Sequence, residues 1–173
     1  SAEVCPHHFA MTEDEIAGDD ANYKMNPPLR SAADVEALVD GLADGTMEAI
    51  STDHAPHGEE EKKQSIAKAP FGIVGSETAY ALSVTHLVKT GKLTPLQLVE
   101  KMSTNPCRIL SVPGGTLSVG EPADITIADM DSEYVIDKNT FLSKGKNTPF
   151  DGAKVNGRVY YTIVGGNIVY QYE

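Results

Sequence analysis

One unit of the sequence constrains the fold more than any other: an amphipathic helix that leads into a short strand and then into a loop rich in titratable groups. Ser31 can cap this helix with Asp34 three residues later, and the apolar side chains at positions 35, 38, 39 and 42 share one helical face. A strand is predicted over residues 46 to 52, and the loop STDHAPH at 51 to 57 follows directly. Because parallel α/β folds place functional groups at the carboxyl ends of strands, this order predicts an α/β protein with a site in that loop.

The patterns elsewhere divide the chain into two parts. A second helix is predicted over residues 76 to 91, and a third begins at Thr94, where a following proline suits the first helical turn. Further on, β-branched and aromatic runs punctuated by glycine are typical of strands, and Gly165-Gly166-Asn167 predicts a tight hairpin turn. We therefore expect residues 1–110 to form one domain and residues 111–173 to form a small β domain.

The composition excludes several classes of function. The net charge of −11 over 173 residues argues against a nucleic-acid partner, because a surface that follows phosphates needs clustered Lys and Arg. No apolar run approaches the roughly 20 residues that cross a bilayer, and no signal peptide is recognisable, so we expect a cytoplasmic protein without a membrane partner. Cys5 and Cys107 are too few for a disulfide framework or a Cys-rich zinc site, which predicts two reduced thiols.

The amino terminus suggests that the chain is a piece of a longer protein. It lacks an initiator Met and opens on a strand-like stretch that ends at the turn Pro6-His7-His8. Imidazole is a common zinc ligand, but adjacent side chains on an extended chain face opposite ways, so His7 and His8 are not expected to share a metal. We expect both to be structural residues.

Seven stretches together resemble the C-terminal part of the bacterial-type dihydroorotases of the amidohydrolase superfamily. They are YKMNPPLRS, STDHAPH, KAPFGIVGSE, MSTNPCRIL, GTLSVGEPAD, KNTPF and TIVGGNIVY, and the resemblance runs nearly end to end. DHAPH alone would fit several cyclic amidohydrolases, whereas NPPLRS and PFGIVG narrow the resemblance to the dihydroorotases. GTLSVGEPAD indicates only the superfamily.

This resemblance implies both a fold and an activity. Residues 1–110 would be the C-terminal strands and helices of a metal-dependent (β/α)8 TIM barrel, followed by part of a small β sandwich in residues 111–173. The implied activity is the reversible, zinc-dependent hydrolysis of the cyclic amide of dihydroorotate to carbamoyl aspartate in pyrimidine biosynthesis. The substrate would therefore be small and anionic, and the complete enzyme would hold two zinc ions.

The resemblance also implies roles for five residues. Asp53 would ligate one zinc ion and act as the general base and acid, because a carboxylate beside a metal can take a proton from water and pass it to the leaving amide nitrogen. Asn26 and His57 match positions that contact the substrate, where an amide and an imidazole suit its carboxylate. The backbone of Phe71 and Gly72 matches the remaining contact, and a glycine there lets the main chain approach the substrate closely.

Simpler interpretations exist for these residues. Without the surrounding motifs, Asp53 would fit a helix cap or a surface ion pair, and Asn26 would fit a turn before two prolines. His57 would fit an exposed loop histidine. His54 is given no catalytic role, because adjacent side chains on an extended backbone point in different directions.

The function as a whole has two alternatives. Another cyclic amidohydrolase, such as a hydantoinase or an allantoinase, would share Asp53 but need not keep Asn26 and His57 for a substrate carboxylate. A noncatalytic homologue could instead be a structural partner, for instance of an aspartate transcarbamoylase. Such proteins typically lose metal ligands, whereas this chain keeps Asp53.

Most of the ligands that the resemblance implies are missing. A complete site of this family uses an early His-x-His, a bridging carboxylate and two further histidines, and no His-x-His occurs among the five histidines of this chain. Since zinc requires three or four converging ligands, one carboxylate cannot retain it. We therefore expect a C-terminal fragment that is inactive alone. Unpaired strand edges and an apolar face also predict association with the missing barrel portion or a homo-oligomer.

Overall fold

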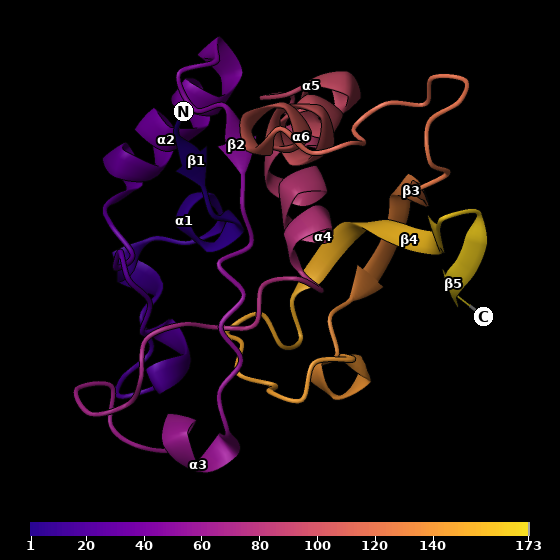
Figure 1. Cartoon of the computed structure of the whole chain (residues 1–173). Coiled ribbons are helices and arrows are strands. Elements are labelled where there is room, and N and C mark those ends of the chain that lie inside the picture. The colour runs from indigo at the N-terminus through magenta and orange to yellow at the C-terminus, as the bar shows by residue number, and fades with distance from the viewer. Residues whose placement is uncertain (173) are drawn as a thin grey trace.

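The computed structural model describes residues 1–172 as an α/β arrangement of short helices with two separate small sheets (Figure 1). The helices are α1 (Pro6–Ala10), α2 (Ala32–Asp44), α3 (Glu59–Lys62), α4 (Ala79–Ser83), α5 (Pro95–Val99) and α6 (Asn105–Leu110). The strands are β1 (Glu3–Val4), β2 (Ala49–Ile50), β3 (Ile125–Val135), β4 (Lys154–Val164) and β5 (Asn167–Gln171). Short 3₁₀ turns occupy Glu13–Glu15, Ala21–Tyr23 and Lys138–Thr140, and π-helical turns occupy Val84–Val88 and Glu100–Thr104.

The first sheet is a parallel pair of very short strands. Glu3 of β1 lies opposite Ala49 of β2, and α2 makes the crossover between them. The predicted cap of α2 is confirmed, because the Ser31 hydroxyl accepts from the Asp34 amide and the Asp34 carboxylate accepts from the Ser31 amide. The predicted strand over residues 46 to 52 is wrong in length. Its partner β1 ends where α1 begins, so the sheet can pair only a few residues.

The segment that was expected to be extended at His7 and His8 is instead helix α1. Pro6 occupies its first turn, where a missing amide hydrogen costs nothing, and the His8 amide donates to the Cys5 carbonyl at 2.9 Å. The assumption that the two histidine side chains face opposite ways is therefore wrong. Their ring centroids lie 4.2 Å apart.

After residue 78, the second helix is shorter than predicted, the third is longer, and both contain irregular turns. α4 continues through the π-helical turn Val84–Val88, and the two together cover residues 79–88 of the helix predicted over residues 76 to 91. α5, the turn Glu100–Thr104 and α6 form one further coil that runs through Asn105 and Pro106. The π-helical turn ends at Thr104, two residues before Pro106, where a regular helix would bring the proline ring against a preceding carbonyl.

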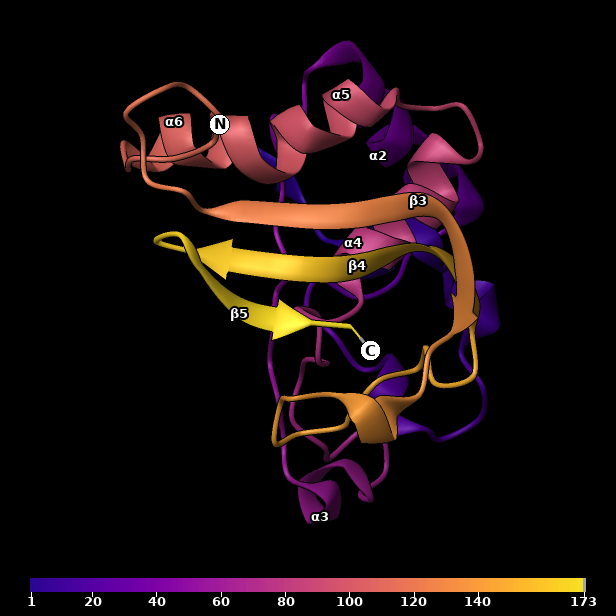
Figure 2. The same cartoon turned by 90° about the vertical axis from the view of Figure 1, so that its right-hand side faces the viewer.

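The second sheet is antiparallel, in the order β3-β4-β5 (Figure 2). The predicted hairpin is confirmed, because β4 and β5 are joined at Gly165 and Gly166, which have φ values of 55° and 79°. β3 is one eleven-residue strand with register shifts against β4, and residues 115 to 124 before it are not a strand. The fold is thus α/β with a small antiparallel sheet, as predicted.

Two apolar clusters form the core. The first packs the strand pair against the helices, with Val4, Leu42, Ile50, Val84, Leu87 and Leu98 among its buried members. The second joins Met25, Leu29, Ile73 and Leu82 to Ile136, Phe150 and Val155, so it contains residues from both predicted domains. The division between residues 1–110 and 111–173 remains a prediction. Among the residues that the structure describes, no helix has the length and apolar character needed to span a membrane.

Candidate active site

Two strand ends bring Asp53 and His7 together. β1 and β2 are parallel, so their carboxyl ends lie at the same edge, and each of the two residues follows its strand by three positions. His7 Nε2 lies 3.9 Å from Asp53 Oδ2. The sequence contained a signal for this proximity, because parallel pairing of the two predicted strands places the residues that follow them side by side.

Asp53 has an unusual backbone conformation. Its φ of 46° is in the left-handed region, which costs a residue other than glycine about 1–2 kcal/mol. Its side chain is 43% exposed, and among residues 1–172 its carboxylate accepts no hydrogen bond. Residues that surrounding structure holds in such conformations cluster at functional sites. The free carboxylate of Asp53 is therefore available to a ligand.

The imidazole next to this carboxylate is buried and lacks a partner. His7 is 2% exposed, and no hydrogen bond within the described part of the chain reaches its Nε2. Burial, with a smaller effect from neighbouring His8, lowers the pKa of His7 to about 3, so the ring is neutral and can offer a lone pair. Burial also raises the pKa of the nearby Cys5 thiol.

These donors fit part of a metal site. Cys5, His7 and His8 each offer one ligand atom, and the three atoms lie within 4.8 Å of one another. Together with Asp53, they supply the carboxylate, imidazole and thiol donors that zinc accepts. An unpartnered buried nitrogen beside a free carboxylate is consistent with a bound cation at this edge of the sheet.

His57, Phe71 and Gly72 form a second contact group. His57 Nε2 donates to the Phe71 carbonyl at 2.8 Å, which leaves Nδ1 as its other polar atom. Gly72 has a φ of 110°, and a Cβ at this position would lie 2.4 Å from Cβ of Ala55. Glycine is therefore required here by the close approach of two loops.

Asn26 is exposed in a loop that connects the two groups. On one side of it, the backbone carbonyl of Lys24 accepts from the Gly72 amide at 2.9 Å. The Nζ of Lys24 lies 4.5 Å from the centroid of the Phe71 ring. Pro27, on the other side, accepts from His8 Nε2 at 2.8 Å. Within residues 1–172, no hydrogen bond joins Asn26 directly to Asp53 or His57.

Sequence reasoning missed two residues that hold these loops in place. The Asn147 side chain accepts from the His57 amide at 2.9 Å and donates to the carbonyls of Ala55 and Gly72, each at 3.1 Å. Lys62 is 8% exposed, and its Nζ donates to the carbonyls of Pro70 at 3.1 Å and Gly72 at 2.9 Å. The motif KNTPF contains Asn147, but nothing in its local pattern indicates a partner 90 residues away.

His54 has a structural place in the same loop. Its Nδ1 accepts from the amides of Gly75 and Ser76, both at 3.2 Å, and the residue pairs with Ile73 as an isolated bridge. The ring therefore anchors the turn after the second contact group. The absence of a catalytic role for His54 stays a prediction.

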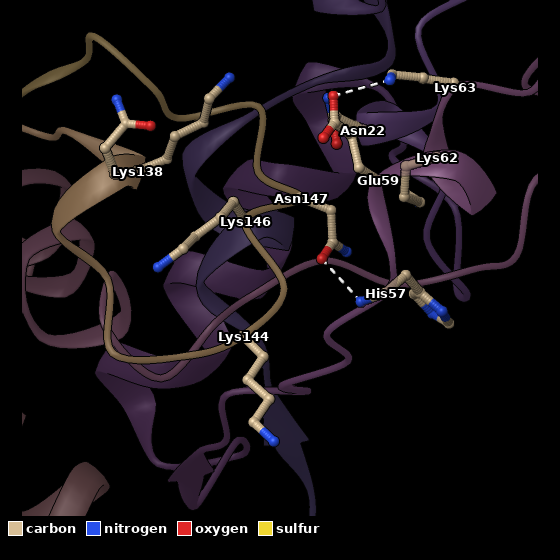
Figure 3. A pocket seen from close by; sticks show the side chains of 10 residues that line it. Asn22, His57, Glu59, Lys62, Lys63, Lys138, Lys144, Lys146 and Asn147 are labelled. Atoms are coloured by element: carbon tan, nitrogen blue, oxygen red, sulfur yellow. Dashed lines mark hydrogen bonds and ion pairs between the residues drawn. The ribbon is translucent and has the colours of Figure 1, made fainter.

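A cavity of about 390 Å³ lies next to these loops (Figure 3). His57 and Asn147 contribute to its lining, and the hydrogen bond between them is drawn in the figure. The other lining residues are Asn22, Glu59, Lys62, Lys63, Lys138, Asn139, Lys144 and Lys146. The cavity is thus polar and rich in lysine.

The sequence itself matches a known protein family. Residues 7–169 match the amidohydrolase family, and the chain belongs to that family. Within it, the chain is 56% identical over 171 residues to the dihydroorotase of Bacillus licheniformis and 53% identical to that of Bacillus subtilis. Each comparison covers 99% of this chain but only 40% of the relative's length.

Comparison with solved structures shows which fold the chain shares. L-Hydantoinase (dihydropyrimidinase) from Arthrobacter aurescens has a TM-score of 0.88 and 34% identity, and dihydropyrimidinase from Brevibacillus agri has a TM-score of 0.90 and 26% identity. Each comparison covers 98% of this chain and 39% of the solved chain. The predicted fold, a portion of an amidohydrolase TIM barrel with a small β domain, is confirmed.

Proposed function

We propose that this chain is the C-terminal part of a dihydroorotase, which in a complete barrel converts dihydroorotate to carbamoyl aspartate and back. The observation that carries the proposal is the identity of 52–56% to the dihydroorotases compared, over nearly the whole chain. The hydantoinase and dihydropyrimidinase structures are less similar, at 34% and 26% identity. We further propose that the reaction belongs to pyrimidine biosynthesis in the cytoplasm.

Asp53 is the proposed general base and acid. Its carboxylate is half-exposed and accepts no hydrogen bond within the described residues, so it is free to take a proton from an attacking water and to deliver it to the departing amide nitrogen. The neutral, buried imidazole of His7 lies 3.9 Å from this carboxylate.

Asp53 is also the proposed metal ligand in this chain. The cofactor would be zinc, two ions in the complete enzyme, with the other ligands supplied by the rest of the barrel. When bound, zinc would polarise the amide carbonyl and lower the pKa of water. The carboxylate of Asp53 and the unpartnered Nε2 of His7 support a cation at this place.

The second contact group is the proposed binding site for the substrate carboxylate and ring. His57 Nδ1 lies 3.8 Å from Glu61 Oε2 and would donate to the substrate carboxylate when both ring nitrogens carry hydrogen, and the amide of Asn26 is exposed. The backbone at Phe71 and Gly72 would face the ring. Lys62 and Asn147 fix the Gly72 carbonyl between them, so the backbone here is held in place before any ligand binds.

Replacing Asp53 tests the proposal directly. The chain is combined with the N-terminal barrel portion of a dihydroorotase relative, and dihydroorotate absorbance is followed for wild type and Asp53→Asn. We expect the variant to lose activity by about 100-fold to 10,000-fold, the usual contribution of a general base. The matched control is Asp40→Asn, an exposed carboxylate on α2.

Three results would decide against this assignment. Equal turnover of wild type and Asp53→Asn would remove Asp53 from the mechanism. Turnover of a hydantoin but not of dihydroorotate would favour the hydantoinase alternative. A folded, assembled barrel without any turnover would favour a noncatalytic partner, for instance of an aspartate transcarbamoylase.

A further inference from the structure

Lysines gather around one cavity of this acidic chain. The chain has eleven lysines and a net charge of −11, yet five of the lysines line the cavity of about 390 Å³ beside His57 (Figure 3). Glu59 is the one acidic residue in this lining. The net charge of the sequence gave no indication of this local excess of positive charge.

The lysines come from two distant segments. Lys62 and Lys63 lie on and directly after α3, whereas Lys138, Lys144 and Lys146 lie between β3 and β4 (Figure 3). Asn147 joins the two segments, because its side chain bonds to the His57 amide and to the Gly72 carbonyl. The cluster is therefore fixed by the tertiary structure.

Only part of this charge is compensated. Lys63 pairs with Glu59 and Glu60, each at 2.9 Å, and Lys138 pairs with Asp151 at 3.2 Å. In the described part of the chain, no carboxylate lies within 4.0 Å of the ammonium groups of Lys62, Lys144 and Lys146. Lys62 and Lys146 donate to backbone carbonyls instead.

Burial makes the uncompensated charge of Lys62 unfavourable. Lys62 is 8% exposed, and burial is the main reason why the pKa of its amine is lowered, with Asp20 opposing this effect and Lys24 adding to it. Like charges that share a small space repel one another unless an anion lies between them. A bound anion would relieve this repulsion and would accept hydrogen bonds from several ammonium groups at once.

We propose that this cavity binds a small molecule that carries two or more carboxylate or phosphate groups. Its volume lies within the roughly 300–1,000 Å³ of small-molecule sites. Lysine suits such a ligand, because its ammonium group is a mobile point charge with three donors. This site is distinct from the strand-end donors at Asp53 and shares only His57 with the proposed substrate contacts, so its existence does not depend on the proposed activity.

Calorimetric titration of the 173-residue chain tests the proposal. The probes are inorganic phosphate and pyrophosphate as phosphate ligands, and succinate and carbamoyl aspartate as dicarboxylates, with acetate as the singly charged comparison. We expect saturable binding of at least one multivalent probe, weaker binding of acetate, and affinity that falls as salt is added. Preference for the phosphates or for the dicarboxylates identifies the source of the natural ligand.

Charge-matched variants locate the binding. Lys144→Met with Lys146→Met removes two charges from the cavity, and we expect affinity to fall by about tenfold or more, since each tenfold is about 1.4 kcal/mol. Lys68→Met with Lys92→Met removes two charges from exposed positions outside it, and affinity should stay within about twofold. Equal losses in the two double variants, or no saturable binding to wild type, would overturn the proposal.

The cavity variant also removes the hydrogen bond from Lys146 to the Phe141 carbonyl and could misfold for that reason. A second measurement therefore uses only the wild-type chain. The wild-type chain is acetylated with and without the tightest probe, and modification of Lys144 and Lys92 is quantified by mass spectrometry. Both lysines are exposed, so both react in the free chain. Protection of Lys144 but not of Lys92 supports the site, and equal reactivity of Lys144 with and without the probe contradicts it.

Discussion

Gly72 is the residue at which several requirements of the site meet. Its amide donates to the backbone carbonyl of Lys24, and its α-carbon faces Ala55. Its carbonyl accepts from the side chains of both Lys62 and Asn147. Neighbouring Phe71 accepts from His57. The position of the substrate-contact loop therefore depends on a residue without a side chain.

Replacing Gly72 by alanine should destabilise the fold. The new Cβ would lie 2.4 Å from Cβ of Ala55, and the backbone has a φ of 110°, so we expect a loss of about 2–4 kcal/mol in the free energy of unfolding. Chemical denaturation measures the loss. Gly120→Ala is the control, because Gly120 has a φ of 96° with nothing within 4 Å of the added Cβ. Similar losses in the two variants would show that the contact with Ala55 is unimportant.

Sequence reasoning at this scale succeeded where partners are close along the chain. The cap pair Ser31 and Asp34 was predicted and is present, because a capping box needs residues only three positions apart. The role of Asn147 was not predictable in this way, since its partner His57 lies 90 positions earlier. The roles proposed for Asp53, Asn26 and His57 came from the family resemblance, and they remain predictions.

Among the elements, α5 shows how a short helix is fixed by one buried face. Thr94 accepts from the Gln97 amide in a complete capping box, and Pro95 occupies the first turn. Leu98 is 1% exposed in the first apolar cluster, whereas Leu96, two residues earlier, is 69% exposed. The helix is stabilised mainly by packing of its inner face.

Truncation of these two leucines should have very different effects. Leu98→Ala should lower the free energy of unfolding by about 2–5 kcal/mol, because it leaves a cavity in the core. Leu96→Ala changes the same side chain on the same helix, and we expect a change within about 0.5 kcal/mol. Thermal or denaturant unfolding of the two variants provides the comparison. A loss for Leu96→Ala as large as that for Leu98→Ala would contradict this packing.

Element types were predicted better than their bounds. The amphipathic period correctly gave α2, and the glycine pair correctly gave the turn between β4 and β5. β1 and β2 are short because α1 begins at Pro6, which a pattern read as extended chain did not reveal. Tertiary packing decides where such elements end.

At the scale of the whole molecule, the strand pair borders an apolar cavity. β1 and β2 pair only with each other among the described residues, so each has an open edge. The cavity beside them has a volume of about 380 Å³, and its apolar lining includes Ala49, Ile50, Met102, Ile109 and Leu110. Open strand edges next to an exposed apolar surface favour association.

We therefore expect the chain to associate in solution. Sedimentation velocity should show species larger than the monomer at micromolar concentration. Leu110→Lys, which places a charge on the apolar surface where Leu110 is 69% exposed, should shift the population toward the monomer. Leu142→Lys is the control, because Leu142 is 85% exposed elsewhere. A compact wild-type monomer with cooperative unfolding would contradict the prediction.

The second apolar cluster has a consequence for how the polypeptide tolerates breakage. It joins side chains from before Leu110 to side chains from beyond Ile125, whereas residues 112 to 124 between them are almost entirely exposed. A protease nick in that connector should leave both pieces noncovalently bound. Separately expressed halves could then be mixed, and the rate at which they reassemble would report when Asn147 first meets His57.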